Sequence, residues 1–322
     1  MSGRRDLLMR AYAATKNLSL ENPAYERWAR VFTFDTYTSD VGGGDITVNS
    51  VLGGLARTGR ALVTSREEGV VAGIREASWF LREVGVDVET RVDDGGRVNP
   101  GDTLMSLEGP AELLLKTERT QLNLVQRMSG IATRTAHLID LVNGADIDCA
   151  IAATRKTPWP MLDKRAVVMG GGVSHRLGLG DAILIKENHL AELVSQGVQK
   201  PITEALHRAW RARERVRFIE IETTTRKEVL EAARCINTLQ NGANTIPCVI
   251  MLDNFLPDDA IAIITELEDE GLRESVLLEG SGNINESNLL KHAATGVDVV
   301  SMGALTHSPR ALDIHQLNKG CD

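Results

Sequence analysis

Cysteine is scarce in this sequence, and no two cysteines stand close together. The 322 residues include Cys149, Cys235, Cys248 and Cys321, with no Cys-x-x-Cys spacing. The absence of paired ligands argues against a structural zinc site, and scattered cysteines are typical of reduced, mostly buried thiols. Because such thiols persist in a reducing compartment, we expect a cytoplasmic protein.

Long apolar runs and an excess of basic residues are also absent. No run approaches the roughly 20 residues that cross a bilayer. The N-terminal stretch has no apolar core long enough for a signal peptide. The formal net charge is −8, whereas nucleic-acid-binding proteins usually carry a basic excess. We therefore expect neither a membrane nor a nucleic acid as a partner.

A local cationic cluster stands out against this acidic background. Arg155 and Lys156 follow the apolar run IDCAIA, and Pro158-Trp159-Pro160 comes soon after. Such a cluster in an acidic protein indicates a pocket for a small anion. Successive strand side chains point to opposite faces, so the backbone must leave strand geometry for both cations to reach one pocket. The prolines prevent both a helix and strand hydrogen bonding at this point. Trp159, between them, either packs in the core or lies along an aromatic substrate.

The first part of the chain mixes helices, strands and turns. Residues 5–30 look helical, SDVGGGDIT is a glycine turn, RALVTS and VVAGI are expected strands, and REASWFLREVG is an amphipathic helix. DDGGRVNPGDTLMSLEGP predicts turns around short strands. A long helical stretch follows over residues 116–143, and Gly130 could break it into two helices.

From residue 147 onward, short apolar runs alternate with helical segments. The runs are IDCAIA, AILIK, RFIEIE, IPCVIML, SVLLEG and DVVSMG, and the helices are expected at about 190–212, 225–240, 257–270 and 286–295. This alternation predicts a parallel βα array whose apolar strands are covered on both faces. Closed arrays of this kind place their chemistry at the C-terminal strand ends, which we call the rim.

Polar or glycine residues end or follow each of the six runs. They are Thr154, Arg155 and Lys156; Lys186, Glu187, Asn188 and His189; Glu222; Asp253 and Asn254; Ser281, Gly282 and Asn283; and Gly303. Six such endings on one rim are better explained by a functional site than by the ordinary contact of strand ends with solvent.

The residue types on the rim suggest what it binds. Its cations suit carboxylates and phosphates, and backbone N–H groups in the Ser281-Gly282 turn suit a terminal phosphate. Glu222 and Asp253 suit Mg²⁺ through water, a pair of sugar hydroxyls, or a developing oxocarbenium cation. A phosphorylated sugar and a carboxylated partner are therefore the expected substrates.

Several of these residues also have simpler interpretations. Lys186 could be the Schiff-base lysine of an aldolase. Glu220 stands two residues before Glu222, and one of the two could face a neighbouring helix. The glycines at 170–172 could form a plain turn, and His189 could be a helix cap or a ligand. His175 beside Arg176 is more readily explained as part of the cationic rim.

Taken together, these motifs resemble the quinolinate phosphoribosyltransferase family, the carboxylating nicotinate-nucleotide diphosphorylases. The matching pieces, in family order, are GGGDIT (42–47), ERTQLNLVQRMSGIAT (118–133), TRKT (154–157), GGGVSHRLGLGDAILIKENH (170–189), IEIE (219–222), IMLDNF (250–255), EGSGNIN (279–285) and GVDVVSMGALTHSPRALDI (296–314). They cover about residues 31–315, and their combination is highly specific.

The resemblance implies an N-terminal α/β sandwich followed by an incomplete α/β barrel of six or seven strands. On this pattern residues 1–122 form the sandwich, residues 123–305 form the barrel, and residues 306–322 return to the first domain. It also implies a homodimer, or an assembly of dimers, with shared active sites. The implied reaction, a step of NAD biosynthesis, joins quinolinate to phosphoribosyl pyrophosphate with Mg²⁺ and yields nicotinate mononucleotide, pyrophosphate and CO₂.

The resemblance also implies a role for each matching residue. Arg119, Arg155, His175 and Arg176 would hold the two carboxylates of quinolinate, with Arg119 coming from the partner subunit. Lys156 and Lys186 would lie between the substrates and contact both, and Glu222 and Asp253 would bind the ribose hydroxyls directly or around Mg²⁺. We expect these last four to be the catalytic residues. Ser281, Gly282, Asn283 and Gly303 would cradle the 5′-phosphate.

One segment departs from the family pattern. TRKT is usually followed by Pro-Gly-x-Arg, but here it is followed by PWPMLDKRAVV, which lacks that arginine and is shorter. A paralogous phosphoribosyltransferase acting on another aromatic nitrogen acid is therefore the main alternative. A Lys186 Schiff-base lyase and a catalytically silent ligand-binding protein are further alternatives. The presence of Glu222 together with Asp253 argues against the silent protein.

Overall fold

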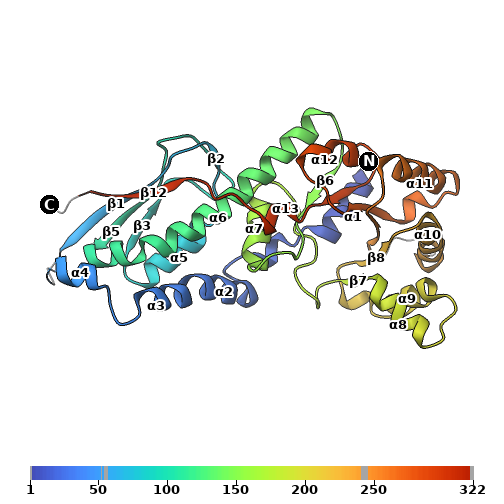
Figure 1. The fold of residues 1–322 in the computed structure, drawn as a ribbon, viewed down its shortest axis with the longest axis horizontal. Coiled ribbons are helices and arrows are strands. Elements are labelled where there is room, and N and C mark those ends of the chain that lie inside the picture. The colour runs from blue at the N-terminus through green and yellow to red at the C-terminus, as the bar shows by residue number, and fades with distance from the viewer. Residues whose placement is uncertain (1, 52, 54–56, 241–245, 320–322) are drawn as a thin grey trace. The chain divides into compact units, whose positions relative to one another are not determined.

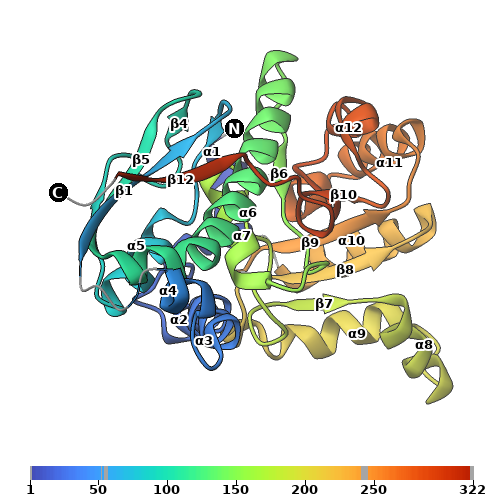
Figure 2. The same ribbon diagram turned by 60° about the vertical axis from the view of Figure 1, so that its left-hand side comes forward.

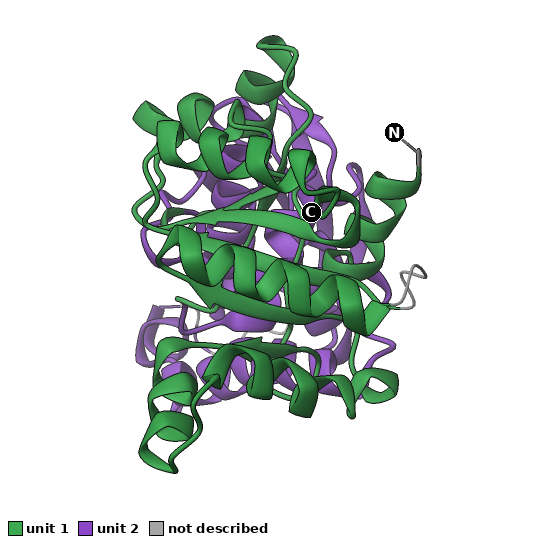
Figure 3. Ribbon diagram, turned by 90° about the vertical axis from the view of Figure 1, so that its right-hand side faces the viewer, with its two compact units in different colours: residues 1–14, 138–156, 172–304 green, residues 15–137, 157–171, 305–322 purple. Residues whose placement is uncertain are grey.

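The computed structural model describes residues 2–51, 53, 57–240 and 246–319. These residues divide into two compact units, coloured separately in Figure 3. Unit 1 comprises residues 1–14, 138–156 and 172–304, and unit 2 comprises residues 15–137, 157–171 and 305–322. These ranges differ from the domains expected from the sequence, because the first helix belongs to unit 1 and residues 123–137 and 157–171 belong to unit 2.

Unit 2 contains a four-stranded antiparallel sheet in the order β12-β1-β5-β3 (Figure 1). The strands are β1 (Thr58–Ser65), β3 (Asp87–Thr90), β5 (Thr103–Pro110) and β12 (Ile314–Lys319), and β2 (Gly69–Val70) pairs with β4 (Arg97–Val98). Pairing of β12 with β1, from Arg60↔Lys319 to Ser65↔Ile314, brings the end of the chain into this sheet. The helical segments are η1 (Thr15–Asn17), α2 (Pro23–Arg30), η2 (Val31–Asp35), α3 (Thr36–Val41), α4 (Ile46–Val51), α5 (Ile74–Glu83), α7 (Pro160–Met169) and most of α6 (Ala111–Gly144). The helix and strands expected between residues 57 and 113 are confirmed, with one exception. Of the expected strand VVAGI, only the first residue lies in a strand, where it ends β2.

The helix expected over residues 5–30 is two helices. α1 spans Ser2–Tyr12, and α2 begins at Pro23 after a loop. Asn22 starts α2 because its side-chain oxygen accepts a hydrogen bond from Ala24 N at 2.9 Å, and proline suits the first helical position.

Gly130 does not break the long helix, which runs unbroken from Ala111 to Gly144. A Cβ atom at position 130 would lie 1.9 Å from the Arg310 carbonyl oxygen. The glycine is therefore required by the close approach of the C-terminal segment to α6, and not by a kink.

Unit 1 is an incomplete α/β barrel with six parallel strands in the order β6-β11-β10-β9-β8-β7. The strands are β6 (Ala150–Ala152), β7 (Ile183–Ile185), β8 (Ile219–Thr223), β9 (Cys248–Asp253), β10 (Leu277–Ser281) and β11 (Val299–Ser301). Each coincides with one of the six apolar runs, and β8, β9 and β10 extend one residue past theirs, so the predicted array is confirmed. Val173 extends the sheet past β6 through a single bridge to Ala152.

Apart from α1, the helices of unit 1 lie outside the sheet (Figure 2). They are α8 (Glu187–Ser195), α9 (Pro201–Trp210), η3 (Arg213–Arg215), α10 (Arg226–Gln240), α11 (Pro257–Asp269), η4 (Arg273–Ser275) and α12 (Glu286–Ala293). The short α13 (Ala304–His307) follows β11, and all but its first residue belongs to unit 2. The helix expected at 190–212 is the pair α8 and α9, since Pro201 starts the second helix.

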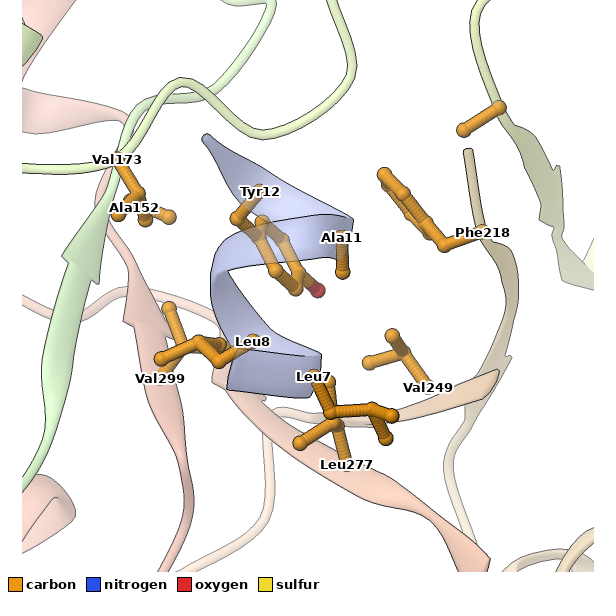
Figure 4. Close-up of a cluster of buried hydrophobic side chains, with 11 residues drawn as sticks. Leu7, Leu8, Ala11, Tyr12, Ala152, Val173, Phe218, Val249, Leu277 and Val299 are labelled. Carbon is orange, nitrogen blue, oxygen red and sulfur yellow. The ribbon is translucent and has the colours of Figure 1, made fainter. Parts of the chain in front are cut away.

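Helix α1 fills the interior of the barrel at the beginning of the strands (Figure 4). Its Leu7, Leu8, Ala11 and Tyr12 pack against residues that come from around the barrel: Ala152, Val173, Ala182, Phe218, Val249, Leu277 and Val299. Arg4 anchors its first turn, because its guanidinium pairs with Asp298 and donates to the carbonyl oxygen of Val276 at 2.7 Å. The apolar layer under the rim is therefore completed by the start of the chain.

Candidate active site

In the strands of unit 1, the functional side chains stand two residues apart. Phe218 packs against α1, Glu220 lies two residues further along the chain, and Glu222 lies two residues beyond Glu220. From Leu277 the same steps lead to Glu279 and Ser281. Because alternate side chains of a strand share one face, each strand carries an apolar residue at the level of α1 and polar residues above it. The expectation that Glu220 or Glu222 could face a neighbouring helix is wrong, since residues two apart point to the same side.

A cavity of about 510 Å³ opens at the rim. It is lined by Thr154, Arg155, Lys156, His175, Arg176, Leu184, Lys186, Glu222, Met251, Asp253, Asn254, Glu279, Ser281, Gly282, Asn283 and Ser301. The structure thus brings together ten of the twelve residues selected from the sequence. The other two, Arg119 and Gly303, are not among the lining residues. The volume lies in the range of cavities that hold small ligands.

Lys186, Glu222 and Asp253 line the cavity from three neighbouring strands: Lys186 follows β7, Glu222 is the last residue but one of β8, and Asp253 ends β9. The Lys186 ammonium pairs with the Glu222 carboxylate. Burial and the negative charge of Glu222 raise the pKa of Asp253. A Schiff-base lysine must react as a neutral amine, and pairing with a carboxylate opposes that. The two acids, in contrast, would be stabilised by a bound cation or by hydroxyl donors.

Arg155 and Arg176 supply positive charge on another side of the cavity. Both Arg155 and Lys156 line it, and both lie beyond the last residue of β6, so the backbone has left strand geometry as expected. Arg176 is buried, and burial together with the positive charge of Arg155 lowers its pKa. Two cations that repel each other in this way are prepared for an anion with more than one charge.

The Ser281-Gly282-Asn283 turn packs around Asn254, which follows β9 and is not among the twelve site residues predicted from the sequence. The Asn254 side chain donates to Asp253 Oδ2 at 2.7 Å and accepts from Asn283 Nδ2 at 3.2 Å. Among the described residues, the non-glycine residues with positive φ are Asp146, His175, Asn254 and Asn283. Three of these four line the cavity. Unfavourable backbone conformations concentrated in one place are a mark of a functional site.

His175 lies at the base of the cavity in a buried cluster with two further acids that the sequence analysis did not select. Its Nε2 is 3.3 Å from both Glu220 Oε2 and Glu279 Oε2, and Tyr12 Oη donates to Glu279 Oε2 at 2.6 Å. Burial lowers the pKa of His175, but the charges of Glu220 and Glu279 outweigh it and raise the pKa to about 9. Burial and Glu279 raise the pKa of Glu220 to about 7.

The tautomer of His175 follows from its backbone contact. The Arg176 N–H donates to Nδ1 at 2.6 Å, so Nε2 bears the proton and directs it at the two carboxylates. This arrangement opposes metal binding at Nε2, although His175, Glu220 and Glu279 lie close enough to be considered as ligands. The imidazolium that the carboxylates favour carries a second proton on Nδ1, so protonation of the ring must open the contact with Arg176 N–H.

Two other residues have structural roles. His189 Nδ1 accepts from Lys186 N at 3.0 Å at the start of α8, which is the helix-cap role. Gly170 ends α7, and a Cβ atom there would lie 2.4 Å from the Ala132 carbonyl oxygen. The glycine turn at 170–172 is therefore a close-packed turn before His175.

Arg119 lies in unit 2, where it lines a separate hollow of about 570 Å³ together with Asp35, Asp40 and Trp159. Its side chain is 59% exposed and lies 4.0 Å from Glu118. Trp159 is half-buried against Phe32, with ring centroids 4.6 Å apart, and another part of the ring faces the hollow. The packing on Phe32 fits the core interpretation of Trp159, and a role beside an aromatic substrate stays a prediction.

The segment after Trp159 is held by buried ion pairs. Arg127 donates to both carboxylate oxygens of Asp163, at 2.9 and 2.8 Å. Arg165 pairs with Glu76 and Asp94, each at 2.8 Å, and its side chain is 5% exposed. Arg165 is therefore committed to the interior of unit 2 and does not replace the arginine that the family pattern has nearby.

An incomplete α/β barrel with a cationic cavity at its strand ends has the architecture of a barrel-type phosphoribosyltransferase. The chain belongs to the quinolinate phosphoribosyltransferase family: the C-terminal domain of that family matches residues 131–316 and its N-terminal domain matches residues 45–129. It is a pentosyltransferase family, which confirms the enzyme class expected from the sequence.

Relatives with sequence and structural similarity span most of the chain. The nicotinate-nucleotide pyrophosphorylase (carboxylating) of Mycobacterium leprae is 42% identical over 278 residues, which cover 84% of this chain and 89% of that protein. Quinolinate phosphoribosyltransferase (decarboxylating) 1 of Nicotiana glauca is 32% identical over 314 residues, covering 94% and 85%. The structure of the Francisella tularensis nicotinate-nucleotide pyrophosphorylase has a TM-score of 0.77 at 29% identity, covering 91% of this chain and 96% of that chain. No described helix is both long enough and apolar enough to cross a membrane.

Proposed function

We propose that this protein transfers the phosphoribosyl group of phosphoribosyl pyrophosphate to quinolinate and releases pyrophosphate and CO₂, leaving nicotinate mononucleotide. The observation that carries this proposal is the rim cavity. There, four Arg and Lys side chains, three carboxylates and a Ser-Gly-Asn turn meet at the strand ends of a chain that belongs to the family.

The division of the cavity suits the two substrates. Arg155, Arg176 and His175 face the acid, since planar guanidinium groups match carboxylates and a dianion needs several cations when it loses water. Ser281, Gly282 and Asn283 hold the 5′-phosphate. Lys186 and Lys156 lie between the two substrates, and Glu222 and Asp253 hold the ribose hydroxyls.

The reaction needs position and electrostatics more than a proton shuttle. The quinolinate ring nitrogen attacks ribose C1 and forms the glycosidic bond while the bond to pyrophosphate breaks. Glu222 and Asp253 stabilise the positive charge that develops on the ribose. The C2 carboxylate then leaves as CO₂, its electron pair is accepted by the alkylated ring, and C2 takes up a proton.

Glu222 and Asp253 fit a Mg²⁺ ion, held directly or through water. The fit rests on the raised pKa of Asp253, to which the charge of Glu222 contributes, because a cation between two such carboxylates relieves their repulsion. When bound, Mg²⁺ supplies positive charge to the pyrophosphate group.

The active unit in this proposal is a homodimer, or an assembly of dimers, in the cytoplasm. Arg119 reaches the acid from the partner subunit, which its exposed position on α6 supports. A reducing compartment suits the unpaired thiols of Cys149, Cys235 and Cys248, whose pKa values burial raises to about 12, 11 and 12. Cys321 lies outside the described residues.

The test is incubation with phosphoribosyl pyrophosphate, Mg²⁺ and a panel of pyridine carboxylates, with pyrophosphate and CO₂ measured. We expect quinolinate to release both. The altered segment after TRKT keeps one alternative open, which is transfer to another aromatic nitrogen acid. Pyrophosphate release with such an acid and none with quinolinate would establish the alternative and overturn the proposal.

A further inference from the structure

The N-terminal helix contributes a residue to the cluster at the base of the active-site cavity. Residues 1–44 lie outside both family matches, which begin at residue 45. Tyr12, at the end of α1, is completely buried, and its hydroxyl is 2.6 Å from Glu279 Oε2 and 3.3 Å from Glu220 Oε1. Figure 4 shows this tyrosine among the apolar side chains of the barrel interior.

His175 depends on the same helix through its backbone. Ser174 N donates to Tyr12 O at 3.0 Å, and Ala14 N donates to Ser174 Oγ at 3.1 Å. Arg217 donates to the carbonyl oxygens of both Ala11, at 2.8 Å, and His175, at 3.0 Å. The end of α1 and the segment that carries His175 are therefore joined by several hydrogen bonds.

These contacts hold His175 in a conformation that it would not adopt unaided. Its φ angle is 55°, in the left-handed region that is unfavourable for a non-glycine residue. The Tyr12 ring packs edge-on against the imidazole at 4.9 Å, and Phe218 packs against it at 5.7 Å. The ring is thus fixed on its sides by two aromatic rings and at Nε2 by the two carboxylates that Tyr12 contacts.

We propose that Tyr12 is a positioning residue for the acid site: its hydroxyl fixes Glu279 and Glu220, and these carboxylates set the orientation of His175 toward the acid. This inference rests on the proposed function, in which His175 contacts the acid. Without the hydroxyl, Glu279 loses a hydrogen-bond donor inside the barrel, and the two carboxylates are free to rearrange around His175.

The chain provides a matched control for the substitution. Tyr25 is also completely buried, and its hydroxyl donates to the buried Glu76 at 2.8 Å. Tyr25→Phe therefore removes the same kind of buried contact in unit 2, from a residue that does not line the rim cavity. Loss of a buried hydrogen bond alone should lower the melting temperature of both variants to a similar degree.

The kinetic test is a double-mutant cycle of Tyr12→Phe with His175→Gln. We expect Tyr12→Phe to raise KM for quinolinate about tenfold, the factor for one hydrogen bond. It should leave KM for phosphoribosyl pyrophosphate within about twofold, and Tyr25→Phe should change neither. In the His175→Gln background, Tyr12→Phe should add no further loss. Additive losses, or equal rises in both KM values, would overturn the proposal.

A measurement without substrate separates this inference from the proposed function. The ring nitrogens of His175 can be followed by ¹H–¹⁵N spectra of histidine-labelled protein, with His175→Gln used for assignment. We expect Tyr12→Phe to shift them and Tyr25→Phe to leave them unchanged. If Tyr12→Phe does not fold, Glu220→Gln carries the same expectation, because it keeps the shape and removes the charge. Unchanged His175 signals refute the positioning role even if quinolinate is not the substrate.

Discussion

Gly282 and Asn254 approach so closely that a Cβ atom on Gly282 would lie 2.3 Å from the Asn254 side-chain oxygen and 2.7 Å from its backbone nitrogen. Both residues have positive φ, 99° and 60°. The turn that we assign to the 5′-phosphate therefore depends on the glycine twice, for its conformation and for the space beside Asn254.

Gly282→Ala should impair binding of the sugar phosphate selectively. The added methyl group must displace Asn254, which also orients Asp253, and the left-handed conformation adds about 1–2 kcal/mol of strain. We expect KM for phosphoribosyl pyrophosphate to rise about tenfold or more, measured from initial rates of pyrophosphate release. Gly144→Ala is the control, since a Cβ atom there meets nothing within 4 Å. An unchanged KM in a folded Gly282→Ala protein would remove the turn from the phosphate site.

Removing a charge on one side of the cavity should affect the KM of one substrate more than that of the other. Glu222→Gln should mainly impair the use of phosphoribosyl pyrophosphate, and Arg176→Ala should mainly weaken the acid. Loss of a charge-assisted contact costs about 1.5–3 kcal/mol, or about 10- to 150-fold in the affected KM. Steady-state kinetics with each substrate varied in turn measures both effects. Equal effects of both variants on both substrates would contradict this division.

Shared active sites can be tested by mixing two inactive proteins. Arg119→Ala and Lys186→Ala affect the two contributing subunits of one site. After random exchange, half of the dimers are hybrids with one intact site, so about a quarter of the wild-type activity should return. Each parent alone is the control, with dimer assembly checked by light scattering. Exchanged hybrids that stay inactive would show that Arg119 does not act across subunits.

Much of the barrel could be predicted because its strands follow a simple rule. Six apolar runs end in polar residues, and parallel strands bring their C-terminal ends to one rim, so ten of the twelve residues chosen from the sequence line the cavity. Applying the period of two more strictly would also have found Glu279, which precedes Ser281 as Glu220 precedes Glu222. Tyr12 could not be found in this way, because no local pattern indicates that a terminal helix packs inside a barrel.

Other errors came from tertiary contacts that overrode local signals. Gly130 looked like a helix break, yet its neighbour is Arg310, which lies far along the chain and leaves no room for a side chain. Asn254 was not selected from the sequence, because its role depends on contacts with the Ser281-Gly282-Asn283 turn of the adjacent strand. Both cases needed the fold before the residue could be understood.

The stability of the protein should fall as the pH rises from about 6 to 8.5. The pKa of His175 is raised to about 9 and that of Glu220 to about 7, both above their ordinary values. Each group therefore binds its proton more tightly in the folded state, and its contribution is lost as the pH rises through the folded pKa. Together they contribute on the order of a few kcal/mol.

Urea unfolding at several pH values measures this dependence. His175→Gln should flatten the curve, whereas His207→Gln, on the exposed side of α9, should not. The buried thiols also lose stabilisation at high pH. They are the same in the wild type and in both variants, so their contribution cancels when the curves are compared. If wild type and His175→Gln show the same dependence, the cluster does not titrate in this range.

The last prediction concerns Trp159 and the acid. Its ring packs on Phe32 with one part and faces the same hollow as Arg119 with another. If Arg119 binds the acid, an aromatic face lies beside that cation where the family pattern has an arginine, and Arg165 is held elsewhere by Glu76 and Asp94. An aromatic face favours a larger ring or fewer negative charges over a second carboxylate.

Trp159→Ala should therefore change the ratio of kcat/KM for quinolinate to that for bulkier or monocarboxylated analogues, in favour of quinolinate. Trp159→Phe keeps an aromatic ring and should retain most of the wild-type preference. Trp28→Ala is the control, because Trp28 packs edge-on against Trp159 at 6.4 Å and does not line the hollow. Unfolding by urea shows how much stability each variant loses. A lower stability with an unchanged preference would assign Trp159 to the core alone.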